Sequence, residues 1–238
     1  MSEVREEYTR ETYPSFGKKY NSERGIISLT SWKARINTVS KTLYSLLTQC
    51  PGFHIVLVLS EEEFPKMMDE LPENLKLFID NKLIEVLWVY KNYKSFKKIL
   101  FTMNKYRDVP IISADDDCIY TCNYAQELYD KWTENKNCII TNDGMPYNIH
   151  KLQWGRGPNT LYPPILSEKI EFIFRYINKI TDFADDDCFY GLFAQKIGIK
   201  YIDLKRKSFY FFHDTIKPLH LRLKSLSQIL NYYKKVLK

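Results

Sequence analysis

Residues 109–120 read VPIISADDDCIY, an apolar run that stops at three consecutive aspartates. Aspartate is a poor strand former, so a buried strand should end where Asp115 begins. Adjacent carboxylates repel one another unless a cation lies among them. In open α/β sheets ligands bind at the carboxyl ends of strands, and hard oxygen ligands suit Mg²⁺ or Mn²⁺. The stretch therefore predicts a cation-binding cluster of Asp115, Asp116 and Asp117 at a sheet edge; the alternative is a charged surface turn.

The residues before this stretch predict a parallel α/β sheet. Three further runs show almost no polar alternation, which is typical of strands covered on both faces. These runs are residues 25–31, 53–59 and 84–89. Segments expected to be helical alternate with them, at residues 39–47, 60–65 and 95–106. The order β-α-β-α-β-α-β predicts right-handed crossovers and a Rossmann-like nucleotide-binding half over about residues 25–120.

After residue 120 the pattern is less regular. Helical spacing and short apolar runs still predict elements. The helices are expected at residues 124–132 and 167–177, and the strands at residues 137–141, 200–204 and 209–213. Residues 142–164 are rich in Asn, Gly and Pro, and a long stretch without regular structure is usually functional or disordered. Its aromatic residues, Trp154 among them, argue against disorder.

Composition is that of a globular α/β protein. The 238 residues are 45% hydrophobic and 27% charged, enough for one large domain or two small ones. Apolar runs stay well below the roughly 20 residues that a membrane span needs. The acidic N-terminus does not resemble a signal peptide. Five cysteines without a C-x-x-C pair predict free thiols in a reducing cytosol, and hence a cytoplasmic protein.

The net charge of +6 lies entirely in the C-terminal tail. Residues 217–238 contain six basic and no acidic residues, so residues 1–216 sum to zero. A nucleic-acid-binding protein would carry a basic face on its folded body, so we expect no nucleic-acid partner. The apolar residues of the tail are spaced alternately by four and three positions, which predicts a basic amphipathic helix. They are Leu219, Leu223, Leu226, Leu230, Tyr233 and Leu237.

Two placements of this tail helix follow from its pattern. Its apolar stripe is expected to pack on the domain or on a second copy of the chain. The alternative is peripheral contact with an anionic membrane, on the inner face of the plasma membrane, to which its lysines would be drawn. A lipid-linked substrate would make that placement useful.

The acidic motif occurs twice. Residues 114–120, ADDDCIY, recur as residues 184–190, ADDDCFY, followed by a helical pattern that stops at Gly198. The second triplet therefore starts a helix, where carboxylates are stabilising by about 0.3–1 kcal/mol without any function. The functional interpretation is a general base in the same cleft as the metal.

Three segments carry a family resemblance: SLTSWKARI at residues 28–36, a D-x-D motif at residues 115–117, and the acidic helix start at residues 185–187. With these the chain resembles bacterial glycosyltransferases of the GT-A type that build capsule or lipopolysaccharide. The resemblance covers about residues 25–214. It implies a mixed, mainly parallel sheet flanked by helices over residues 1–216, with an acceptor half at about 121–216.

The resemblance also implies an activity and its partners. Such enzymes move a sugar from a nucleotide-sugar, here a UDP-sugar by preference, to a hydroxyl of a glycan or a lipid-linked saccharide. Mn²⁺ or Mg²⁺ stabilises the charge that develops on the diphosphate leaving group. The acceptor hydroxyl needs a positioned base to take its proton. Because a second carboxylate is available as that base, we expect inversion at the anomeric carbon.

Residue roles follow by similarity to that family. Asp115 and Asp117 are expected to hold the metal, with Asp117 the direct ligand, and Asp115 to contact the nucleotide while Asp116 can face the donor sugar. Asp186 is expected to be the base, with Asp185 or Asp187 as substitutes.

The remaining expected donor-site and metal-site residues are Thr30, Arg35, Lys97, Lys98, Trp154 and His213. Thr30 and Arg35 would hold the nucleoside, and Lys97 or Lys98 would reach ribose or phosphate. His213 would complete the metal shell, and Trp154 with the following Gly-Arg-Gly loop would form a flexible wall. The alternatives are a surface arginine, a solvated lysine face, a structural histidine and a packed tryptophan.

Two other functions are compatible with the acidic strand. A metal-dependent nucleotidyltransferase or phosphotransferase would release pyrophosphate or phosphate, but such enzymes normally carry a Gly-rich phosphate loop, which this sequence lacks. A non-catalytic module would bind nucleotide or glycan without turnover, and replacing Asp186 would not matter to it.

Overall fold

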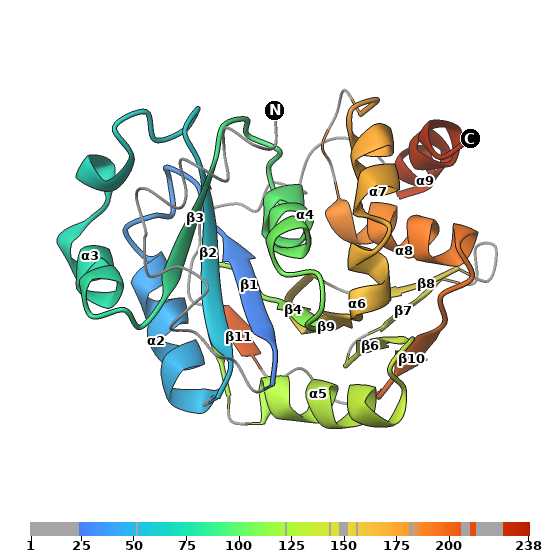
Figure 1. Cartoon of the computed structure of the whole chain (residues 1–238), viewed down its shortest axis with the longest axis horizontal. Helices are drawn as coiled ribbons and strands as arrows, with labels where there is room; N and C mark the ends of the chain where they lie inside the picture. Colours follow the sequence, from blue (N-terminus) through green and yellow to red (C-terminus); the bar gives the residue numbers. More distant parts are fainter. Residues whose placement is uncertain are drawn as a thin grey trace.

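A computed structural model describes residues 24–50, 52–121, 123–142, 144–147, 152–155, 157–180, 183, 185–205, 210–212 and 226–238. A seven-stranded sheet forms its centre, in the order β10-β6-β9-β4-β1-β2-β3 (Figure 1). Its strands are β1 (Ile26–Thr30), β2 (His54–Ser60), β3 (Glu85–Val89), β4 (Ile111–Ser113), β6 (Ile139–Thr141), β9 (Thr160–Tyr162) and β10 (Tyr201–Asp203).

The sheet is mixed but mainly parallel, as the sequence predicts. β1 lies parallel to both β2 and β4, and β6 lies parallel to β10. β9 runs antiparallel between β4 and β6 and joins the two halves. Because the strands are buried on both faces, they read as continuous apolar runs rather than alternating ones.

Helices cover both faces of the sheet, and each face has its own hydrophobic cluster. One face carries α4 (Phe96–Lys105), α6 (Pro164–Ser167), α7 (Ile170–Ile177), α8 (Asp186–Lys196) and α9 (Leu226–Val236). The other face carries α2 (Val39–Gln49), α3 (Glu73–Asp80) and α5 (Tyr124–Glu134). Figure 1 shows the first group at the upper right and the second at the left and bottom of the sheet.

Two small antiparallel sheets and two 3-10 turns complete the described chain. One sheet pairs β5 (Cys118–Tyr120) with β11 (Tyr210–Phe212), and the other pairs β7 (Gly144–Tyr147) with β8 (Leu152–Gly155). The 3-10 turns are η1 (Met67–Glu70) and η2 (Gly157–Asn159). β5 follows the first acidic triplet directly, so this small sheet continues from the edge of the large one.

Three expectations for secondary structure were wrong. A helix does not begin at residues 60–65; the chain turns there, and the helical residues come later, in η1 and α3. The stretch 142–164 is not irregular throughout, because it contains β7, β8 and the central strand β9. The helix expected at residues 167–177 begins later, at Ile170 in α7, because Ser167 ends α6 and the chain turns between the two helices.

The C-terminal helical extension is confirmed over α9. Leu230, Tyr233 and Leu237 are buried in the same cluster as the α8 residues Phe189 and Phe193, so this part of the predicted stripe packs on the domain. The earlier stripe residues Leu219 and Leu223 lie outside the described residues.

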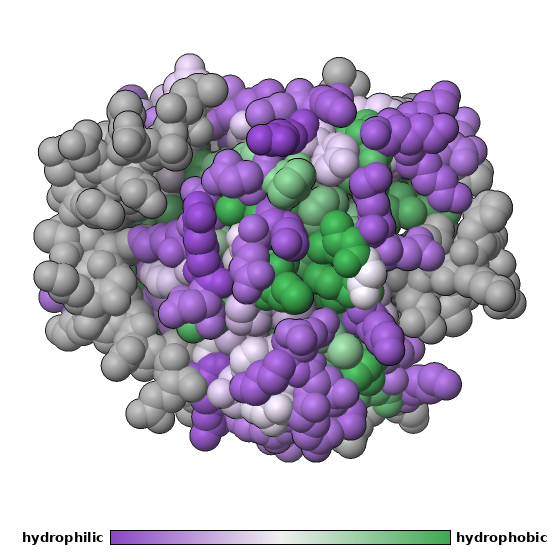
Figure 2. All heavy atoms as spheres, turned by 45° about the vertical axis from the view of Figure 1, so that its right-hand side comes forward, coloured by the Kyte–Doolittle hydropathy of each residue, from purple (hydrophilic) through white to green (hydrophobic). Residues whose placement is uncertain are grey.

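The described helices have at most 11 residues each. None of them is both long enough and apolar enough to pass through a bilayer. On the face shown in Figure 2 the coloured surface is mostly hydrophilic, and apolar side chains show between the hydrophilic ones, most of them near the centre. Contact of this helix α9 with anionic lipid stays a prediction.

Candidate active site

The first acidic triplet follows β4, as the sequence predicts. The amide of Ala114 still donates to the carbonyl oxygen of Ser28 in β1 at 2.9 Å, so the ladder runs up to the residue before Asp115. The hydroxyl of Tyr120 accepts a hydrogen bond from the Asp115 amide at 2.8 Å. The triplet therefore leaves the carboxyl edge of the parallel strands as a short, well-anchored connection to β5, which is where open α/β sheets bind ligands.

Asp116 is the anchor of that connection. Its Oδ2 accepts from the Ser31 hydroxyl at 2.6 Å, and its Oδ1 accepts from Arg35 Nη1 at 2.9 Å. Its carbonyl oxygen accepts from the Thr42 hydroxyl at 2.9 Å. Burial raises the pKa of Asp116 to about 6, against the opposing effects of Ser31 and Arg35. The expected contact of this carboxylate with a donor sugar stays a prediction, because both of its oxygens already have protein partners.

Arg35 joins two members of the triplet. Its Nη1 lies 2.9 Å from Asp116 Oδ1 and 2.9 Å from Asp117 Oδ2, and the residue is only 7% exposed. The alternative of a surface arginine is therefore wrong. Burial, followed by the charge of Asp115, raises the pKa of Asp117, and Arg35 works against this. Its contact with a nucleoside remains a prediction; in the free protein the guanidinium holds the triplet in place.

Lys98 brings the two acidic triplets together. Its Nζ lies 2.7 Å from Asp115 Oδ1 and 3.6 Å from Asp186 Oδ2, and the residue is 3% exposed. Burial alone would lower the pKa of Lys98, but the charges of Asp115, Asp186 and Asp187 outweigh it and hold that pKa well above its usual range. The expected convergence of the two triplets is thus present, with a lysine ammonium between them.

Lys97 points to a different set of partners. Its Nζ lies 2.9 Å from Glu63 Oε2 and donates to Asn92 Oδ1 at 2.9 Å. Burial lowers its pKa, although Glu63 opposes this effect. Both Lys97 and Lys98 are buried, so the alternative of a solvated lysine face is wrong.

The second triplet starts α8, and its members have different environments. Asp185, with φ of 54°, is the N-cap, and its Oδ1 accepts from the Cys188 amide at 3.1 Å. Asp186 lies next to Lys98. Burial and the charge of Asp186 raise the pKa of Asp187 well above its usual range. The helix-capping role considered for the triplet thus applies to Asp185, while Asp186 pairs with Lys98, which also contacts the first triplet.

Three other expected site residues are Thr30, Trp154 and His213. The Thr30 hydroxyl, at the end of β1, donates to the Val58 carbonyl oxygen at 2.7 Å. Trp154 belongs to β8, but its side chain is outside the described part of the chain. His213 also lies outside the described residues. The residue before it, Phe212, pairs with Cys118, which follows Asp117.

The residues present fit a divalent cation. Two cationic side chains, Arg35 and Lys98, contact four of the six carboxylates in the two triplets. Asp186 Oδ2 and Asp187 Oδ1 are buried and have no hydrogen-bond partner among the described residues. No three His, Cys, Asp or Glu side chains of the described chain form a ready-made metal cluster. Mg²⁺ commonly uses one or two carboxylates together with substrate phosphates and water, so this arrangement remains suitable.

Several residues that support the site were not predicted as site residues. Ser31 and Thr42 hold Asp116, and the Ser45 hydroxyl accepts from the Tyr120 amide at 3.0 Å. The Tyr124 hydroxyl donates to the carbonyl oxygen of Ser113. Ser31 lies inside the segment SLTSWKARI, which is the one signal that pointed to it; the others are ordinary helix and strand residues whose partners are distant in sequence.

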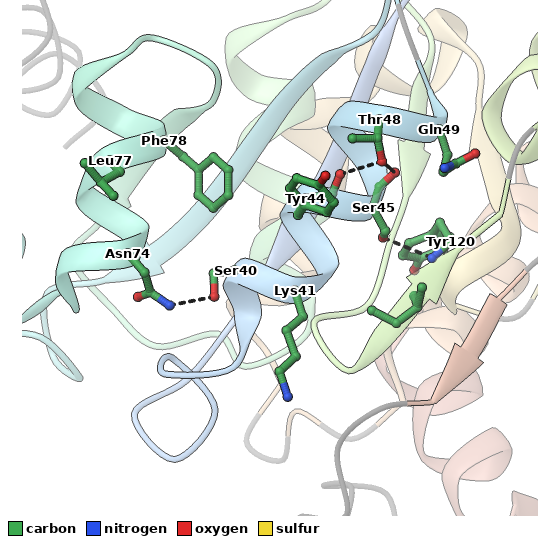
Figure 3. Close-up of a pocket in the computed structure, with 11 residues that line it drawn as sticks. Ser40, Lys41, Tyr44, Ser45, Thr48, Gln49, Asn74, Leu77, Phe78 and Tyr120 are labelled. Carbon is green, nitrogen blue, oxygen red and sulfur yellow. Dashed lines mark hydrogen bonds between the residues drawn. The ribbon is translucent and has the colours of Figure 1, made fainter.

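A surface cavity of about 630 Å³ lies on the other side of α2, between α2, α3 and β5 (Figure 3). Tyr44 stands at its centre, and Phe78 and Leu77 face it from α3. The side chains of Ser40 and Asn74 hydrogen-bond to each other at its rim, at 2.8 Å. None of the aspartates of the two triplets lines this cavity, although Tyr120, which accepts from the Asp115 amide, does.

Comparison with known proteins rests on structure. No family model and no curated protein sequence matches this chain. A solved structure, S. aureus TarS 1-349 in complex with UDP-GlcNAc, matches with a TM-score of 0.60 at 10% sequence identity. The match covers 90% of this chain and 65% of that one.

The fold is GT-A-like. At this identity the likeness shows the fold and leaves the activity to be argued from the site. The chain spans about 65% of the length of the solved TarS chain, so whatever the rest of that protein contributes has no counterpart in the match. The fold prediction, a mixed and mainly parallel sheet flanked by helices, is confirmed.

Proposed function

We propose that this protein is a metal-dependent glycosyltransferase that moves a sugar from a nucleotide-sugar to a hydroxyl of a glycan or a lipid-linked saccharide. The observation that carries the proposal is the contact of one ammonium, Lys98 Nζ, with both Asp115 and Asp186. Two acidic clusters about 70 residues apart in the chain thus share one site at the carboxyl edge of a GT-A-like sheet. A UDP-sugar is the favoured donor, because the structural neighbour was solved with UDP-GlcNAc.

On the donor side, Asp115 and Asp117 would hold Mn²⁺ or Mg²⁺, with His213 as a further ligand. The ion, when bound, stabilises the negative charge that a nucleoside diphosphate gains as it leaves. Asp116 and Arg35 hold Asp117 in place through buried contacts. Thr30 and Arg35 would lie beside the nucleoside, either Lys97 or Lys98 near its ribose or phosphates, and Trp154 along the donor.

On the acceptor side, Asp186 would take the proton of the attacking hydroxyl. It is the member of the second triplet that pairs with Lys98, which also contacts Asp115, whereas Asp185 caps the helix. A base opposite the leaving group predicts inversion of the anomeric carbon. Asp187, whose pKa is raised, is less suited to accept a proton from a sugar hydroxyl at neutral pH because its carboxyl group retains its own proton more strongly.

The acceptor belongs to capsule or lipopolysaccharide assembly in this proposal, which would place the protein in the cytoplasm, at the inner face of the membrane. Lys234 and Lys235 of α9 lie on the side not buried by the apolar stripe, and would face anionic lipid.

A thermal-shift panel of UDP-, GDP- and CMP-sugars, each with and without Mn²⁺, tests the proposal. We expect one nucleotide class to raise the melting temperature only when Mn²⁺ is present, and Asp117→Ala to abolish the shift. Release of pyrophosphate would point instead to a nucleotidyltransferase. Binding without turnover, together with a harmless Asp186→Asn change, would point to a non-catalytic module. NMR analysis of the product that showed retention would reject the inverting mechanism.

A further inference from the structure

The position of Lys98 is set by the sheet. The Ser28 hydroxyl of β1 donates to the Lys98 carbonyl oxygen at 2.6 Å and lies 2.7 Å from the Thr102 hydroxyl, one turn further along α4. Both contacts are buried, so α4 is fixed against β1 at this level. The lysine stem therefore extends from a rigid base, which is what a residue needs if it is to hold other groups at a defined separation.

The ammonium of Lys98 contacts two acidic residues that are distant from each other in the sequence. Asp115 follows β4, and Asp186 begins α8, which comes after β9, α6 and α7 in the chain. Among the ion pairs of the described residues, Lys98 is the side chain that contacts a member of each triplet. An ammonium has three donors on one compact centre, so it can serve two carboxylates at once.

We propose that Lys98 is a positioning residue that fixes the separation between the donor-side carboxylate Asp115 and the acceptor-side carboxylate Asp186. This inference rests on the proposed function, since it assigns Lys98 a role in aligning the base with the bound donor. Without the ammonium, the partly exposed carboxylate of Asp115 and the buried carboxylate of Asp186 would repel each other and move apart. A shift of about 1 Å in such a group can slow transfer on the order of a hundredfold.

The contact can be tested without any substrate, by a double-mutant cycle on urea unfolding in EDTA. The variants are Lys98→Met, Asp186→Asn and the pair together. Lys98→Met removes the positive charge that contacts Asp115 and Asp186. We therefore expect Asp186→Asn to have a more favourable effect on the free energy of unfolding in the Lys98→Met protein than in the wild type. The folding equilibrium constant of the double variant should differ at least tenfold from the value expected if the effects of the two single changes were additive. If Lys98→Met alone does not fold, recovery of folding in the double variant is the same result.

A matched control uses the same helix. Lys105 lies at the other end of α4 and pairs with Glu85 at 3.8 Å. The cycle of Lys105→Met with Asp186→Asn should be additive within twofold. Additivity within twofold for the Lys98 cycle as well would overturn the proposal.

Kinetics then separate positioning from direct contact with the donor. For Lys98→Met we expect kcat to fall at least a hundredfold while the donor KM changes less than threefold, and Lys98→Arg to recover part of kcat because it keeps the charge. A raised donor KM with unchanged kcat would show that Lys98 binds the donor instead. If the wild type neither binds nor turns over a nucleotide-sugar, the proposed function fails, but the unfolding cycle still decides whether Lys98 couples the two triplets.

Discussion

Asp116 should make the stability of this protein depend on pH in an unusual direction. Its pKa is about 6 in the folded protein and 3.8 in the unfolded chain, so the folded state binds the proton more tightly. The protonated carboxyl therefore contributes stability that is fully present below pH 3.8 and is lost as the pH rises through 6. At about 1.4 kcal/mol per pKa unit, the whole contribution is about 3 kcal/mol.

Comparison with Asp116→Asn isolates this contribution, because the asparagine cannot ionise. Its amide oxygen can still accept from Arg35, and its amide group can donate to the Ser31 hydroxyl oxygen. The assay is urea unfolding of both proteins at pH 4 and pH 7, in EDTA so that no divalent ion binds the triplet. The wild type should lose about 2 kcal/mol relative to the variant between these pH values, since the unfolded carboxyl is already partly ionised at pH 4. Asp80→Asn, at an exposed aspartate of α3, controls for the loss of one carboxylate.

A free-energy difference between wild type and Asp116→Asn that stays flat, or that favours the wild type as the pH rises, would refute the reasoning. It would mean that Arg35 and Ser31 outweigh burial and that Asp116 is a stable carboxylate in the folded protein. The ion pair with Arg35 would then be a net source of stability at neutral pH.

Two further changes test the packing of the site and of the tail. Arg35→Met leaves Asp116 and Asp117 buried without their shared cation, and we expect the free energy of unfolding at pH 7 to fall by about 3–5 kcal/mol; a change below 1 kcal/mol would contradict the buried pairing. Leu230→Ala should lower the free energy of unfolding by about 2–5 kcal/mol, because this leucine is buried in the cluster that contains α8. An unchanged urea midpoint would show that α9 is not docked.

The first half of the fold was predictable because its signals are local. β1, β2 and β3 are mainly apolar runs, and α2 between the first two keeps one apolar stripe. The helix between β2 and β3 was expected too early, at residues 60–65 rather than in η1 and α3. β9 was missed because it is the three-residue strand TLY within a segment rich in Asn, Gly and Pro. Its stability comes from pairing with β4 on one side and β6 on the other, and both partners are distant in sequence. Single-sequence patterns do not report such pairings.

The acidic residues of the candidate site could be predicted from the sequence, but the partners of its lysines and its arginine could not. The repeat of ADDDC marks both triplets, and the structure brings Asp115 and Asp186 to one lysine. Lys97 and Lys98 look the same in sequence, yet they lie about 100° apart around the helix and take different partners. Arg35 could be expected near the site from its motif, but its buried contact with Asp116 and Asp117 depends on the fold.

Calorimetric titration of a nucleotide-sugar, with UDP-GlcNAc as the first probe, tests the account most directly when the wild type, Asp117→Ala and Asp186→Asn are compared with Mn²⁺ and with EDTA. We predict that the wild type and Asp186→Asn bind with Mn²⁺ and not with EDTA, and that Asp117→Ala binds in neither condition. If no UDP-, GDP- or CMP-sugar binds the wild type, or if Asp117→Ala binds as the wild type does, the two triplets do not form a donor site.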